Sequence, residues 1–81
     1  MRSSWERAFA QWLDENGIEW LYEPPPFPLD DGTHYTPDFY LPKEDRYIEV
    51  KGYLTPAARR KLARFQEVYP TIRLEVYWEA D

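Results

Sequence analysis

Two short segments that alternate between apolar and polar side chains, joined by a turn, constrain this chain most. Residues 36–41 (TPDFYL) and 47–52 (YIEVKG) have the period of two that β-strands require. A turn centred on Lys43 and Glu44 would pair them as an antiparallel hairpin, with Leu41 facing Arg46 and Tyr40 facing Tyr47. The pattern therefore predicts two neighbouring strands in a defined register.

In this register the two strands separate their side chains into an apolar face and a polar face. One face would carry Phe39, Leu41, Ile48 and Val50, and the other would carry Asp38, Tyr40, Tyr47, Glu49 and Lys51. The apolar face is expected to be core and the polar face to be the functional site. Asp38 and Glu49 would lie opposite each other, and like charges in that position repel by roughly 0.2–1 kcal/mol. A divalent cation between them would remove this repulsion.

The size and composition of the chain limit what it can build. The 81 residues are expected to form one domain, residues 1–81, with a thin core. Aromatic residues make up 19% of the sequence, including four Trp and seven Tyr, which is more than so small a core can hide. Some aromatic side chains are therefore expected on a ligand surface or between subunits, and a homodimer is predicted.

Cysteine is absent, which excludes disulfides and thiolate metal sites and fits a reducing compartment. Any metal must then be held by oxygen ligands or by His34. The amino terminus lacks the apolar run of a secretion signal, and no segment approaches the ~20 apolar residues of a membrane span. We therefore expect a cytoplasmic protein with no membrane association.

The charge is unevenly distributed along the chain. The net charge of −5 argues against binding nucleic acid by overall electrostatics. The segment from Lys51 to Arg64, however, has no acidic residue and carries five cations, Lys51, Arg59, Arg60, Lys61 and Arg64. The four cations that follow Lys51 form either a track for phosphates or an ordinary solvated helix face.

The amino-terminal part of the chain predicts a helix, a strand and a loop. Ser3 and Glu6 have the spacing of a capping box, and Trp5, Ala8, Phe9, Trp12 and Leu13 follow at helical spacing until Asn16 and Gly17. The Trp5, Phe9 and Trp12 stripe is expected to be core or a dimer seam rather than a base-stacking platform. Residues 18–22 suit a strand. The proline-rich residues 24–28 are predicted to join neither sheet nor helix and to continue as a stiff loop through residues 30–32.

The carboxyl-terminal part predicts a helix and a strand. Thr55 as N-cap and Pro56 at the first helical position open a helix whose apolar stripe is Ala58, Leu62, Phe65 and Tyr69, and Pro70 ends it. Ile72, Leu74, Val76 and Trp78 then alternate with Arg73, Glu75, Tyr77 and Glu79, as in a half-buried strand. The predicted order is helix, three strands, helix, strand.

These residues resemble the PD-(D/E)XK, or restriction-endonuclease-like, nuclease superfamily. Pro37 and Asp38 resemble the first half of its motif, and Glu49-Val50-Lys51 resembles the E-x-K half. The segment from Val50 to Pro56 is similar to that of small phage-encoded and bacterial members. The resemblance implies an α/β (α+β) core of order αβββαβ, with a mixed four-stranded sheet flanked by two helices. It also implies an endonuclease that hydrolyses phosphodiester bonds in DNA, including branched or structured DNA, with RNA not excluded.

Mg²⁺ is the expected cofactor and Mn²⁺ its substitute, because hard oxygen ligands select these ions; no nucleotide or organic cofactor is expected. Asp38 and Glu49 are the predicted ligands. The resemblance adds the backbone carbonyl of Val50 as a third ligand. It also implies that Lys51 orients or deprotonates the attacking water and stabilises charge on the phosphate. Glu6 is implied as a fourth catalytic residue that reaches the metal through water, or it is only a helix cap.

Several alternatives stay open at this stage. Asp38 and Glu49 could belong to a solvated hairpin face, with Lys51 as a counter-ion. The domain could be a catalytically silent relative that binds nucleic acid or a protein, or an interaction module that uses its proline-rich loop. His34 is expected in a loop, with contact to a nucleic acid as the alternative, and Tyr53 could stack on a base or sugar.

Overall fold

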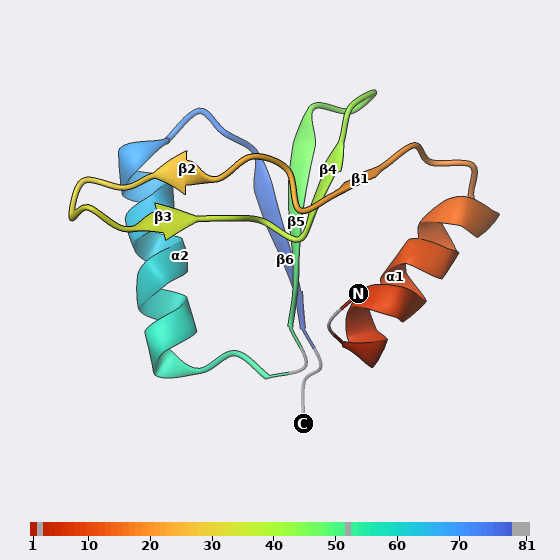
Figure 1. The fold of residues 1–81 in the computed structure, drawn as a ribbon, viewed down its shortest axis with the longest axis horizontal. Helices are drawn as coiled ribbons and strands as arrows, with labels where there is room; N and C mark the ends of the chain where they lie inside the picture. Colours follow the sequence, from red (N-terminus) through yellow and green to blue (C-terminus); the bar gives the residue numbers. More distant parts are fainter. Residues whose placement is uncertain (2, 52, 79–81) are drawn as a thin grey trace.

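The computed structural model of this chain describes residues 1, 3–51 and 53–78. The elements in chain order are α1 (Ser4–Glu15), β1 (Leu21–Tyr22), β2 (Phe27–Pro28), β3 (His34–Tyr35), β4 (Phe39–Leu41), β5 (Arg46–Lys51), α2 (Pro56–Val68) and β6 (Leu74–Trp78). Four strands form a mixed sheet of order β1-β4-β5-β6, in which only β5 and β6 run parallel. Figure 1 shows α1 and α2 on opposite sides of this sheet. The predicted α+β class, with two helices and a mixed four-stranded sheet, is confirmed.

Helix α1 begins and ends where the sequence predicts. The Ser3 hydroxyl accepts a hydrogen bond from the Glu6 backbone N–H at 3.1 Å, which caps the first turn. Gly17 follows the helix with a φ of 65°, a left-handed conformation that glycine adopts without strain. The backbone N–H of Ile18 then donates to the carbonyl of Leu13 at 2.9 Å and turns the chain toward β1.

The face that α1 turns toward the sheet differs from the prediction. Its buried residues are Glu6, Ala10 and Leu13, whereas Trp5 and Trp12 are 44% and 50% exposed. Glu6, Ala10 and Leu13 follow the i, i+4, i+7 spacing of one helix face, so the tryptophans lie on a neighbouring face. The expectation that the stripe is core is therefore wrong for Trp5 and Trp12, whereas Phe9 packs against the core. The alternative of a dimer seam stays a prediction.

Strands β4 and β5 pair in the predicted register, with Phe39 opposite Ile48, Tyr40 opposite Tyr47 and Leu41 opposite Arg46. The β4 strand begins at Phe39, later than predicted, because Pro37 has no N–H to donate to a sheet. Gly52, predicted as the end of β5, lies outside the described residues. The hairpin is thus confirmed over the part that positions Asp38 and Glu49.

The proline-rich segment was predicted to stay out of any sheet, and this prediction is wrong. Strand β2 pairs antiparallel with β3, so that Phe27 lies opposite Tyr35 and Pro28 opposite His34. Proline is tolerated because each of these two strands has a neighbour on one side only. His34 consequently lies in a strand rather than in a loop. This small second sheet brings Phe27 and Tyr35 over the four-stranded sheet.

Helix α2 starts as predicted, with the Thr55 hydroxyl accepting from the Ala58 N–H at 3.1 Å and Pro56 in the first turn. Strand β6 begins at Leu74 rather than at Ile72, because the Ile72 N–H donates to the Tyr69 carbonyl in the turn that leaves the helix. Glu79, predicted as part of this strand, lies outside the described residues. Neither helix is long and apolar enough to cross a membrane, as judged over the described residues.

Apolar clusters cover both faces of the sheet. One, on the α1 side, has Ala10, Leu13, Phe39, Leu41 and Ile48 at its centre. The other, on the α2 side, has Leu29, Tyr35 and Phe65 at its centre. The predicted apolar face is core, and the face predicted to carry the site is covered by apolar packing as well. Helix α2 must bury its own apolar stripe, and with β2 and β3 it covers the face that carries Tyr47 and Glu49.

Candidate active site

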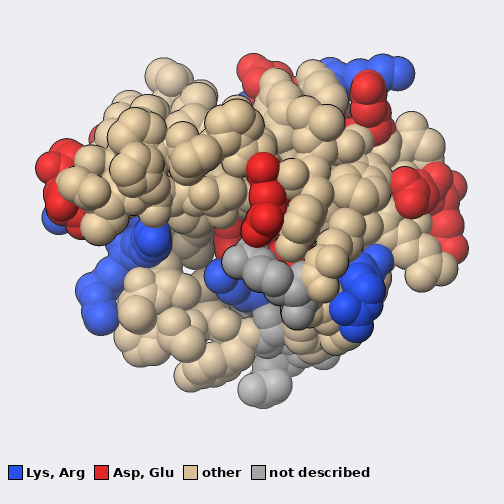
Figure 2. Space-filling view, in the orientation of Figure 1, with Lys and Arg blue, Asp and Glu red and all other residues tan. Residues whose placement is uncertain are grey.

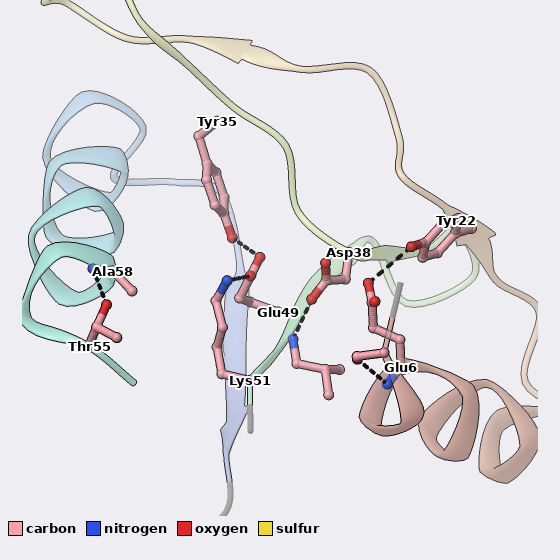
Figure 3. Close-up of polar contacts among 10 residues, drawn as sticks. Glu6, Tyr22, Tyr35, Asp38, Glu49, Lys51, Thr55 and Ala58 are labelled. Atoms are coloured by element: carbon pink, nitrogen blue, oxygen red, sulfur yellow. Dashed lines mark hydrogen bonds and ion pairs between the residues drawn. The ribbon is translucent and has the colours of Figure 1, made fainter. Parts of the chain in front are cut away.

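Three carboxylates are buried at the ends of the elements that meet beside β5. Glu6 in α1 is 3% exposed, Asp38 just before β4 is 2% exposed, and Glu49 in β5 is 3% exposed. Within the described part of the chain, all buried charged side chains are acidic. Figure 3 shows the Asp38 carboxylate between those of Glu6 and Glu49. The structure thus brings Asp38 and Glu49 together, as predicted, and places Glu6 beside them.

Hydrogen bonds to its side chain and its backbone hold Asp38 in place. Its side-chain oxygen Oδ2 accepts from the Val50 backbone N–H at 2.7 Å. Its own N–H donates to the Ile48 carbonyl at 3.1 Å, and its carbonyl accepts from the Glu23 N–H at 2.8 Å. The Asp38 side chain thus takes a backbone donor of β5 at the residue just before β4 begins. The carboxylate is thereby fixed against the strand that carries Glu49 and Lys51.

Glu49 is engaged through both of its carboxylate oxygens. Oε1 accepts a hydrogen bond from the Tyr35 hydroxyl, and Oε2 lies 2.8 Å from the ammonium nitrogen Nζ of Lys51. Tyr35 is buried, whereas the Lys51 side chain is 37% exposed. Lys51 lies on the same side of β5 as Glu49, as predicted from their spacing. Its side chain extends from the buried Glu49 carboxylate to the surface.

Glu6 combines a backbone role with a side-chain role. Its N–H donates to the Ser3 hydroxyl, as in half of a capping box. Its carboxylate oxygen Oε2 accepts from the Tyr22 hydroxyl at 3.1 Å and the carboxyl shares a hydrogen bond with Asp38. The side chain thus lies beside Asp38, in a place from which it can act on the same ligand.

The environment of Asp38 opposes its ionisation. Burial is the main cause, and the negative charges of Glu49 and Glu6 add to it, whereas the bond from the Val50 N–H acts in the opposite direction. Together these effects raise the pKa of Asp38 from 3.8 to about 7. Burial, and then the charge of Glu49, also raise the pKa of Tyr35 above its ordinary value. A cation close to Asp38 would therefore strongly stabilise its ionised carboxylate.

The donor set fits a magnesium or manganese ion held in part by water. Across residues 1, 3–51 and 53–78, no three acidic or histidine side chains are close enough to enclose an ion on their own. Mg²⁺ does not need such a cage, because it usually keeps several waters and takes one or two carboxylates together with a substrate phosphate. Asp38 and Glu49 supply carboxylates of this kind, and Val50 lies between Glu49 and Lys51 in β5.

The residues predicted to touch nucleic acid lie on the surface in separate places. Arg59, Arg60, Lys61 and Arg64 are all exposed on α2. Arg60, Lys61 and Arg64 line a pocket of about 310 Å³ with Leu29, Asp31 and Thr33, and Arg64 lies 3.3 Å from Asp30. Tyr53 is 68% exposed, and His34 is exposed on β3. Figure 2 shows Lys and Arg side chains in several small groups on the face drawn, not in one stripe.

Sequence reasoning missed three groups that hold the carboxylates. The hydroxyls of Tyr22 and Tyr35 donate to Glu6 and Glu49, and the Val50 N–H donates to Asp38. Val50 lies two residues beyond Ile48, the partner of Phe39 at the start of β4, and this position near Asp38 offered a signal for the last of these. Tyr35 offered none, because it reaches Glu49 from a two-stranded sheet that the proline-rich sequence argued against.

Comparison of this chain with protein-family models and with curated proteins finds no match.

Proposed function

We propose that this chain is a metal-dependent endonuclease that hydrolyses phosphodiester bonds in DNA. The observation that carries the proposal is the position of Asp38, buried between Glu6 and Glu49, with Lys51 paired to Glu49. A structural role alone does not account for three neighbouring buried carboxylates, two of which raise the pKa of Asp38 by their charge, because such contacts lower stability. A site that receives a divalent cation accounts for them directly.

The chain's own residues would divide the work in the following way. Asp38 and Glu49 bind the cation, with the Val50 carbonyl and Glu6, the latter through water, as further contacts. Lys51 presents a point charge that suits a phosphate oxygen and orients the attacking water. Tyr35 and the Val50 N–H keep the two carboxylates in place. The bound cation supplies Lewis-acid polarisation of the phosphate and neutralises its charge.

The architecture supports the same proposal. When the small β2-β3 sheet is set aside, the elements follow one another as helix, three strands, helix, strand. We propose that this is the αβββαβ core of the PD-(D/E)XK nucleases. The homodimer and the cytoplasmic location are proposed on the composition, namely the surplus of aromatic residues and the absence of cysteine.

The exposed cations of α2 support a nucleic acid as the substrate. Arg60, Lys61 and Arg64 border one pocket, on an element that begins five residues after Lys51. A group of cations favours binding of a phosphate backbone, because it neutralises phosphate charge and releases the bound counterions. DNA is the proposed substrate, and RNA is included as a separate arm of the test.

The experiment is a cleavage assay on supercoiled, linear, single-stranded and four-way-junction DNA, and on RNA, in Mg²⁺, Mn²⁺ or chelator. Wild-type protein is compared with Asp38→Asn and Glu49→Gln, with circular dichroism to show that each is folded. The proposal predicts cleavage that needs the metal and is lost in both variants. Folded wild-type protein that cleaves none of these substrates contradicts it.

The same assay distinguishes the silent relative. A silent nucleic-acid binder would bind the DNA equally well in Mg²⁺ and in chelator and would leave it intact. A protein-interaction module would neither bind nor cleave it.

A further inference from the structure

An open pocket with aromatic walls lies beside the candidate active site, outside the set of carboxylates. Its volume is about 290 Å³. Helix α1 and strands β5 and β6 line it, through Trp5, Ala8, Phe9, Trp12, Val50, Lys51 and Tyr77. Four of these seven residues are aromatic, and the single charged one, Lys51, is a cation. The lining is therefore mainly apolar, and the ammonium of Lys51 is paired with Glu49 at 2.8 Å.

The aromatic rings of the pocket already associate with one another. Phe9 stacks with Trp12, with ring centroids 5.9 Å apart and an angle of 26° between the ring planes, and it contacts Tyr77 at 5.2 Å. Trp5, Trp12 and Tyr77 are 44%, 50% and 41% exposed. Phe9 thus holds the rings of Trp12 and Tyr77 in place while much of their area faces solvent. Such surfaces favour a flat aromatic ligand.

Three of the lining residues are neighbours or partners of the candidate site residues. Trp5 directly precedes the buried Glu6 in α1. Val50, which lines the pocket, donates its N–H to Asp38. Lys51, next to it, is paired with Glu49 through Nζ. The pocket and the Lys51 ammonium therefore lie on opposite sides of β5 near its end, so a nucleic-acid strand that passes this end could place a base in the pocket and a neighbouring phosphate at Lys51.

We propose that this pocket binds an unstacked nucleobase of a nucleic-acid strand whose phosphate lies at Lys51. The placement of the phosphate rests on the proposed function. Stacking on aromatic side chains accepts any base, because every base has a π-face, and Lys51 supplies the complementary charge for the phosphate. A volume near 300 Å³ is at the small end of ligand pockets and suits a base better than a helix or a duplex.

The inference narrows the substrate of the proposed nuclease. A base can enter the pocket only when it is out of the double-helical stack, which costs least where the nucleic acid is single-stranded or unpaired. The enzyme would therefore act on strands with an unpaired nucleotide next to the cleaved bond.

The test measures tryptophan fluorescence and binding in chelator, which prevents metal-dependent cleavage. The probes are oligothymidylate, oligouridylate and an abasic oligomer with the deoxyribose-phosphate backbone of the first. Wild-type protein should show quenching and at least roughly fivefold tighter binding with both base-containing probes than with the abasic one. Trp12→Leu should bind all three alike. Leu21→Ala, which shortens a side chain 52% exposed on β1, is the control and should match wild type.

The outcomes separate this inference from the proposed function. Equal binding of wild type to the abasic probe, or unchanged base-dependent binding by folded Trp12→Leu, overturns the nucleobase pocket even if the protein cleaves DNA. Conversion of a dimer to a monomer by Trp12→Leu with unchanged oligonucleotide binding overturns it too and assigns the pocket to a second copy. Base-dependent quenching by a protein that cleaves nothing supports the pocket and contradicts the nuclease.

Discussion

The carboxylate of Asp38 accepts a hydrogen bond at 2.7 Å from the backbone N–H of Val50. This bond ties the acidic residue that precedes β4 to the middle of the Glu49-Val50-Lys51 segment in β5. It holds Asp38 next to Glu49 although both are buried and the negative charge of Glu49 raises the pKa of Asp38. The arrangement lowers the stability of the fold and positions two metal ligands in advance, as functional sites often do.

The first prediction concerns stability and pH. The pKa of Asp38 is about 7 in the folded chain and close to 3.8 in the unfolded one. The folded state therefore holds the proton more tightly, and this contribution to stability is complete below pH 3.8 and is lost as pH rises to about 7. In chelator, Asp38→Asn should be more stable than wild type at pH 8 by at least about 1 kcal/mol, the equivalent of roughly one pKa unit.

Urea unfolding of both proteins between pH 4 and pH 8 measures this effect. The difference between the two isolates Asp38, because the other carboxylates titrate in both and asparagine retains an acceptor for the Val50 N–H. A difference that does not grow with pH would show that Asp38 ionises as freely in the folded chain as in the unfolded one.

The second prediction concerns the metal. A cation that binds only the folded chain should stabilise wild type by about 2.7 kcal/mol at ~100 times its Kd. Asp38→Asn should lose most of this stabilisation, because it lacks one of the two charged ligands. Thermal unfolding in Mn²⁺, Mg²⁺ and chelator at pH 8 gives the answer, and equal stabilisation of both proteins would place the ion elsewhere.

The third prediction concerns Tyr35, whose hydroxyl donates to Glu49. Tyr35→Phe keeps the buried ring and removes only this donor, so the Glu49 carboxylate loses its orientation. Groups that orient a metal ligand typically change metal affinity by ~10–100-fold. Calorimetric titration with Mn²⁺ should show weaker binding by at least roughly tenfold.

Tyr69→Phe is the matched control for Tyr35→Phe. It removes a tyrosine hydroxyl that donates to the Pro28 carbonyl at 2.6 Å, without contact to a carboxylate of the site. Its Mn²⁺ affinity should equal that of wild type. Equal affinities for all three proteins would mean that Tyr35 serves packing alone.

The fourth prediction concerns the cations of α2. If Arg60 and Lys61 contact phosphates, replacing either by Gln should weaken DNA binding for all sequences and lower the slope of log affinity against log salt by roughly one unit. Lys43→Gln removes the same charge from the exposed turn between β4 and β5 and should leave the slope unchanged. Equal slopes for all the variants would identify the α2 cations as a solvated face.

The sequence predicted those parts of the fold that depend on neighbouring residues, such as strand pairing across a short turn and the starts of helices. The register of β4 on β5 followed from strict alternation and a short turn, and the starts of α1 and α2 followed from Ser3 and Thr55 as caps. These signals lie within a few residues of the structure they determine, so a single sequence carries them.

The errors came where distant contacts decide. Phe27 and Pro28 join a strand because Phe27 finds Tyr47, Phe65 and Tyr69 with ring centroids 5.1 Å away, residues far along the chain. Likewise, α1 turns Glu6 rather than Trp5 toward the sheet, because Tyr22 and Asp38 offer its carboxylate partners. The tyrosines that hold the carboxylates were missed for the same reason.

The central claim is that Asp38, Glu49 and Lys51 form a phosphodiester-cleaving centre that needs a divalent cation. Nicking of supercoiled DNA by folded wild type and folded Lys51→Ala, measured in Mg²⁺ and in chelator, tests it most directly. We predict nicking by wild type in Mg²⁺ only, and a rate at least ~100-fold lower for Lys51→Ala, as for loss of a positioned electrostatic or proton-transfer group. Nicking that persists in chelator, or equal rates for the two proteins, would contradict the claim.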